Sequence, residues 1–108
     1  MSTLNAGRQL IKAALESGFT VAVHYENDDD PEITRDGAEH LVALWSEATA
    51  CDSATVFLYP DRVTSYHAGW AYLVHGNDPD ETVSDHSASG WVNDWCVGTD
   101  YGQREWKQ

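Results

Sequence analysis

The chain has 108 residues, 42% of them hydrophobic, so it is long enough to bury a core and wholesale disorder is excluded. Its 18 acidic residues outnumber the 6 basic ones and give a formal net charge of −12. A surface of that charge repels nucleic acid and anionic membranes and attracts basic proteins or cations. Solubility or adaptation to salt is the alternative explanation of the same charge.

The first half of the sequence predicts a helix, two strands and a second helix. Residues 4–16 carry apolar side chains at helical spacing, with Thr3 or Asn5 available as the N-terminal cap. Residues 19–25 alternate between apolar and other side chains, which indicates a half-buried strand. Residues 32–35 predict a short return strand, and 36–50 a helix with an apolar stripe. That stripe consists of Leu41, Leu44, Trp45 and Ala48.

The second half predicts a hairpin and a third helix. Residues 54–59 and 63–74 are rich in strand formers, and Pro60 marks a turn between them, so we expect an antiparallel hairpin. Residues 76–81 indicate a loop. The third helix is predicted from the spacing of Trp91, Val92, Trp95 and Cys96.

These elements predict one α+β domain spanning residues 1–108. The order α-β-β-α-β-β-α favours a four-stranded, mainly antiparallel sheet with the helices packed on one face. Residues 1–20 lack the pattern of a signal peptide, and no apolar run reaches the length of a membrane span. We therefore expect a cytoplasmic protein without a membrane partner.

Acidic side chains gather in two clusters, and the chain has no Lys or Arg between Arg62 and Arg104. Aromatic side chains lie near both clusters, and ten Trp and Tyr residues exceed what a small core needs. An aromatic patch rimmed by carboxylates is typical of a protein-binding surface. The predicted partner-binding residues are Asp28, Asp29, Asp30, Glu32, Asp78, Asp80, Glu81, Asp85, Trp70 and Trp91.

No catalytic motif is present in the sequence. Phosphate-binding glycine loops and the GxSxG nucleophile pattern are both absent. Cys51 and Cys96 match no zinc or redox spacing, which favours free thiols and gives no local signature for a catalytic cysteine–histidine pair. We predict no cofactor, and a binding protein rather than an enzyme.

Two weaker patterns suggest metals. Four acids occupy positions 1, 3, 5 and 12 of a calcium loop, but Ile33 stands where the sixth position requires Gly. The four acids are Asp28, Asp30, Glu32 and Glu39. Histidines with neighbouring acids offer an alternative metal- or substrate-binding site, although nothing brings three ligands together. That set is His24, His67, His75, Asp78 and His86.

The string GWAYLVHGNDPDETVSDHS at residues 69–87 resembles a segment of small acidic proteins carried by phages and prophages. The resemblance implies an inhibitor context, because such proteins often block host factors, including CRISPR effectors and other nucleic-acid-binding proteins. The stretch contains no catalytic motif, and the resemblance names no target.

Taken together, the sequence predicts a non-enzymatic interaction protein that binds a basic host protein. Its carboxylates would occupy a Lys/Arg-rich groove that normally holds nucleic acid, as a DNA mimic or anti-CRISPR-like inhibitor does. The alternatives are the histidine-based metal or substrate site and a homodimeric structural protein joined through a strand edge or aromatic patch.

Overall fold

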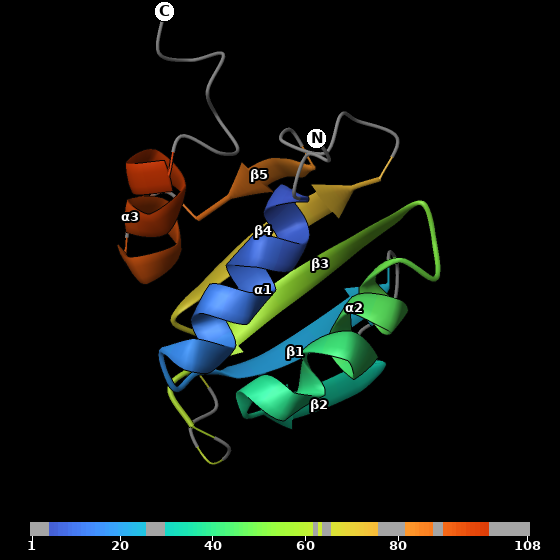
Figure 1. Cartoon of the computed structure of the whole chain (residues 1–108), viewed down its shortest axis with the longest axis horizontal. Coiled ribbons are helices and arrows are strands. Elements are labelled where there is room, and N and C mark those ends of the chain that lie inside the picture. Colours follow the sequence, from blue (N-terminus) through green and yellow to red (C-terminus); the bar gives the residue numbers. More distant parts are fainter. Residues whose placement is uncertain are drawn as a thin grey trace, which may run out of the picture.

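The structure is a computed structural model that describes residues 5–25, 30–61, 63, 66–75, 82–87 and 90–99 (Figure 1). These residues form an α+β fold in the order α1-β1-β2-η1-α2-β3-β4-β5-α3. The α+β class is confirmed. The predicted order lacked one strand, since the described residues form a five-stranded sheet rather than four strands.

Helix α1 (Ala6–Glu16) begins at a side-chain cap. The Asn5 Oδ1 atom accepts hydrogen bonds from the backbone N–H groups of Gly7, at 2.8 Å, and Arg8, at 3.3 Å. This bonding satisfies donors that the first helical turn leaves without partners. The predicted helix and its Asn5 cap are therefore confirmed over the described residues.

Strands β1 (Thr20–Tyr25) and β2 (Ile33–Asp36) pair antiparallel, as the sequence predicts. The second helix does not start at Asp36, because that residue pairs with Thr20 in the sheet. Gly37, with φ of +92°, turns the chain out of β2 into a 3-10 turn, η1 (Ala38–His40). The α-helix proper, α2, covers Leu41–Ala48.

Strands β3 (Ser53–Tyr59) and β4 (Gly69–Val74) form the predicted antiparallel pair, but the second strand is shorter than expected. Leu58 pairs with Gly69, so an extended hairpin would place Pro60 opposite His67. Proline has no N–H to give to the ladder, and the pairing stops there. The predicted strand is therefore wrong at its described residues 63 and 66–68, where Val63 and Tyr66 are exposed outside the sheet.

Strand β5 (Val83–His86) was missed by the sequence patterns. It pairs antiparallel with β4 through Tyr72 and Asp85, and the register then shifts so that Leu73 faces Val83. This bulge interrupts the alternation of buried and exposed side chains on which strand prediction depends. The predicted loop at 76–81 lies outside the described residues.

The strand order in the sheet is β2-β1-β3-β4-β5, with every neighbouring pair antiparallel. Helices α1 and α2 lie across one face, and α3 (Gly90–Thr99) lies beside β4 and β5 (Figure 1). Side chains from all three described helices join one core with the strand side chains beneath them. We call this side of the sheet the covered face.

Close approach of helix to strand sets the position of α3. A Cβ atom on Gly69 would lie 2.6 Å from the Cγ2 atom of Val92, so only glycine leaves room for the helix there. Val92 and Cys96 are buried, and the half-buried Trp91 and Trp95 pack against the same core. The predicted third helix and its apolar side are confirmed.

Candidate protein-interaction surface

The side of the sheet opposite the helices carries a group of aromatic side chains. Residues paired across antiparallel strands point to the same side, so the register assigns this face. We call it the open face, because none of the described helices packs on it. Its members are Thr34 and Asp36 of β2, Thr20, Ala22 and His24 of β1, Ser53, Thr55, Phe57 and Tyr59 of β3, Trp70, Tyr72 and Val74 of β4, and Asp85 of β5.

Four rings lie on β3 and β4, two neighbouring inner strands of the sheet. Phe57 and Trp70 are direct cross-strand partners, with Tyr59 and Tyr72 two residues along β3 and β4. All four residues are half-buried, so each still presents part of its surface to solvent. A sheet face that only meets water usually carries small polar and charged side chains. Rings in these positions therefore indicate a contact surface.

Two histidines extend this ring cluster. The His24 ring stands edge-on to Phe57, with the ring centroids 4.9 Å apart. His67, which precedes β4, lies 5.1 Å from the same Phe57 ring and 6.4 Å from Tyr59. The structure thus brings together two members of the alternative metal set, but through ring contacts with Phe57.

Carboxylates border the rings at both edges of the sheet. Asp85 on β5 is exposed and lies directly across from Tyr72, while the half-buried Asp36 lies on β2 across from Thr20. The Asp85 Oδ1 atom accepts the backbone N–H of His86 at 2.9 Å, which fixes the carboxylate at this edge. No Lys or Arg belongs to the open face over the described ranges.

The predicted partner-binding residues are divided by the fold. Asp85 and Trp70 share the open face, with Asp85 in strand β5 and Trp70 in β4. Asp30 and Glu32 are exposed where the chain enters β2. Trp91 contacts the Phe19 ring at 5.2 Å and packs against the core from α3, away from the open face. Asp28, Asp29, Asp78, Asp80 and Glu81 lie outside the described residues.

The calcium-loop pattern does not correspond to a loop. Its sixth to ninth positions are residues 33–36, which form β2 and pair with β1. A calcium loop needs those positions to curl around the ion. Glu39, at the twelfth position, instead lies 3.8 Å from the Nε2 atom of His40. Over the described ranges, no three His, Cys, Asp or Glu side chains gather closely enough to hold a metal ion.

The remaining histidines have separate structural surroundings. The His75 Nε2 atom donates to the Ala48 carbonyl at the end of α2, at 2.5 Å, and its ring stands edge-on to Trp45. The His86 side chain is buried, and its Nδ1 atom donates to the Ser87 carbonyl at 2.8 Å. Its Nε2 atom has no hydrogen-bond partner among the described residues.

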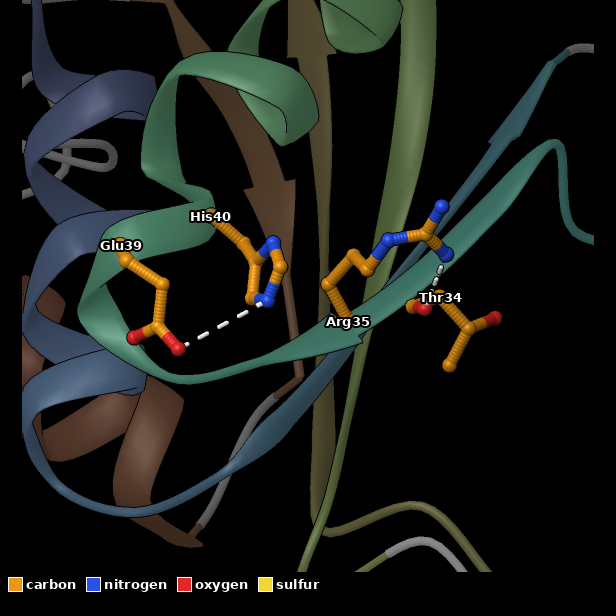
Figure 2. A network of polar contacts seen from close by, with 4 residues as sticks. All are labelled: Thr34, Arg35, Glu39 and His40. Atoms are coloured by element: carbon orange, nitrogen blue, oxygen red, sulfur yellow. Dashed lines mark hydrogen bonds and ion pairs between the residues drawn. The ribbon is translucent and has the colours of Figure 1, made fainter.

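Figure 2 shows polar contacts at the β2 edge, beside η1. Arg35 donates from its guanidinium to the Thr34 carbonyl at 2.8 Å, and Glu39 pairs with His40. Each contact joins neighbours in the sequence, and these side chains lie on the surface. Such pairs contribute little to stability and assemble no site.

Cys51 is exposed and Cys96 is buried, and neither forms a disulfide. Burial raises the pKa of the Cys96 thiol to about 12. A thiol with that pKa stays protonated near neutral pH and is a poor nucleophile. This burial argues against Cys96 as the cysteine of a catalytic pair.

Helix α2 is held to β1 by a hydrogen bond from Tyr25. Its hydroxyl donates to Glu47 Oε1 at 2.6 Å. This bond, together with desolvation and the Glu47 charge, raises the pKa of Tyr25 to about 12. Glu47 is therefore a structural partner, although its sequence position suggests only a solvated helix face.

None of the described helices combines the length and the apolar character that crossing a membrane requires. Comparisons of the chain with protein-family models, curated proteins and solved structures found no match. The functional argument therefore depends on the open face and on the charge of the chain.

Proposed function

We propose that this protein is a non-enzymatic interaction protein that binds a basic partner protein through the open face. The observation that carries the proposal is the cluster of half-buried rings on a face without a helix, bordered by Asp36 and Asp85. Rings supply contact area at low entropic cost, and carboxylates at the rim supply attraction and orientation.

The net charge of −12 supports a basic partner and opposes direct binding of nucleic acid. A nucleic-acid-binding protein presents the complementary surface, since its groove accommodates closely spaced negative charge. The finer proposal is an inhibitor that occupies such a groove in a host protein, in the cytoplasm. This finer proposal is supported by the resemblance of residues 69–87 to small acidic phage proteins, some of which block CRISPR effectors.

A ring substitution tests the face itself. The immobilised chain and a Trp70→Leu variant should be exposed in parallel to host lysate, and retained proteins identified by mass spectrometry. We expect a basic, nucleic-acid-binding protein on the wild-type chain and its loss from the variant. After purification, the retained nucleic-acid-binding protein should release its bound nucleic acid when the wild-type chain is added. An identical set of retained proteins on both chains would contradict binding through the open face.

Matched charge variants test the acidic surface. The first variant replaces Asp78, Asp80, Glu81 and Asp85 with Asn or Gln. The control removes the same charge from exposed positions elsewhere: Glu16, Glu39, Asp52 and Asp94. Glu47 is left out of the control because its carboxylate accepts a hydrogen bond from the Tyr25 hydroxyl, so neutralising it would also change a structural contact.

We expect the first variant to weaken partner affinity about tenfold at low salt and the control about twofold, with a flatter salt dependence in the first. The measurement is affinity by calorimetry across a salt series. Equal weakening would mean that only total charge matters. No weakening in either variant would assign the acidity to solubility.

A further inference from the structure

We infer that the open face selects arginine side chains, so that its occupant is an arginine-rich segment of the basic partner. The inference rests on the proposed function and adds the chemistry of the contact. It starts from the direct cross-strand pairing of an aromatic ring, Tyr72, with an exposed carboxylate, Asp85. Trp70 is two residues before Tyr72 on the same strand and the same face.

The spacing suits one planar cation. Side chains that are direct partners across antiparallel strands start about 5 Å apart at Cβ. A guanidinium that lies over a ring of β4 can therefore reach the Asp85 carboxylate with its N–H groups. The Asp85 Oδ1 atom already accepts the His86 N–H, which restricts the carboxylate while the side chain stays exposed.

Arginine suits the combination of a ring and a carboxylate better than lysine does. The guanidinium is flat and weakly hydrated, so it stacks on a ring and still donates in its plane to a carboxylate. A lysine ammonium is compact and strongly hydrated, and it gains mainly from charge. A face with carboxylates alone would distinguish the two cations far less.

The rest of the open face agrees with an added cation. Over the described ranges, this face contains no Lys or Arg, and the charges that it carries are the carboxylates of Asp36 and Asp85. His24 and His67 both lie against Phe57, one strand away from Tyr72. Because Tyr72 and Asp85 are direct cross-strand partners, we assign this end of the open face to the partner's arginine.

Two peptides of equal charge test the inference on the full chain: acetylated, amidated nona-arginine and nona-lysine. Affinity is measured by calorimetry at one fixed salt concentration, and the bound face is identified by NMR shifts of backbone amides. We expect nona-arginine to bind about fivefold tighter, with the largest shifts in β4 and β5.

Variants then assign the preference to the ring and the carboxylate. Trp70→Leu and Asp85→Asn should each reduce the arginine-to-lysine affinity ratio toward one, while Trp70→Phe, which keeps a ring, should preserve it. The Asp94→Asn variant, on the exposed side of α3, is the charge control and should leave the ratio unchanged. Near-UV circular dichroism checks that each variant is folded. If Trp70→Leu unfolds, the arginine-to-lysine affinity ratios of Asp85→Asn and Trp70→Phe decide the result.

The outcomes separate this inference from the proposed function. Equal binding of both peptides with shifts on the open face would overturn arginine selection and leave the interaction role standing. Absence of binding, or shifts away from the open face, would contradict both. A preference for arginine that survives Trp70→Leu and Asp85→Asn would also overturn the inference.

Discussion

The two faces of the sheet are built from the same strands and carry different side chains. Val21, Val56, Leu58 and Leu73 of the covered face are fully buried under the helices, with small residues such as Ala71 between them. The residues that alternate with them along the strands point to the open face, and these carry rings and polar side chains instead. The covered face therefore supplies the buried core, and the open face carries half-buried rings.

This difference has a physical meaning. Aliphatic and small side chains let a helix approach closely and leave few polar groups to satisfy. Rings with polar tips tolerate partial exposure and bind strongly when a partner removes the remaining water. The first prediction below tests this contrast directly, and the other three test the contacts that hold the helices on the covered face.

The largest expected effect comes from truncating neighbouring residues that point to opposite faces. Leu58→Ala should lower the free energy of unfolding by about 3 kcal/mol, because it leaves a cavity in the core. Phe57→Ala should cost about 1 kcal/mol, since that ring is only half-buried. Urea denaturation followed by tryptophan fluorescence measures both. Similar losses would show that the open face is as tightly packed as the covered one.

A smaller loss is expected where β4 meets α3. Gly69→Ala should destabilise the protein by about 2 kcal/mol, because the added methyl group meets Val92. Gly98 is the matched control, since a Cβ atom there meets nothing within 4 Å. Gly98→Ala should be neutral or stabilise by about 0.5 kcal/mol through helix propensity. Thermal unfolding compares the two, and a neutral Gly69→Ala would contradict this packing of α3.

Thiol reactivity tests the same packing without changing a side chain. Cys51 is exposed, so it should react with a thiol reagent at once in the native protein. Cys96 should react at least about a hundredfold more slowly, because the helix must first open. Its pKa of about 12 also keeps the thiol protonated. Spectroscopic titration gives both rates, with Cys51→Ser identifying the fast phase; equal rates would place Cys96 at the surface.

The smallest effect concerns the hydrogen bond between Tyr25 and Glu47. The pKa of Tyr25 in the folded protein is raised from 10.0 to about 12, so the bond contributes stability below pH 10.0. That contribution is lost as pH rises through about 12, since ionised tyrosine cannot donate. Glu47→Gln should lower the pKa of Tyr25 toward its ordinary value.

Tyrosinate absorbance of wild-type, Tyr25→Phe and Glu47→Gln proteins isolates this titration. Glu16→Gln removes a charge from an exposed position of α1 and should leave the curve unchanged. A Tyr25 contribution that appears at the ordinary pKa in the wild-type protein would contradict the bond to Glu47.

The sequence by itself predicted the elements whose signals are local. Helix α1 follows from its apolar spacing and from Asn5, whose side chain caps it. Strand β3 and helix α3 follow from short runs of suitable side chains. The acidic character follows from composition, and the role of Trp70 and Asp85 in partner binding stays a prediction.

The tertiary structure decided what depends on pairing. Strand β4 starts at Gly69 because its register with β3 would bring Pro60 into the ladder, and β5 exists because β4 offers a partner to a short, bulged segment. The rings of Phe57 and Tyr59 join those of Trp70 and Tyr72 for the same reason. Alternation along one strand predicts which side chains share a face, but only the register between strands determines which of them meet.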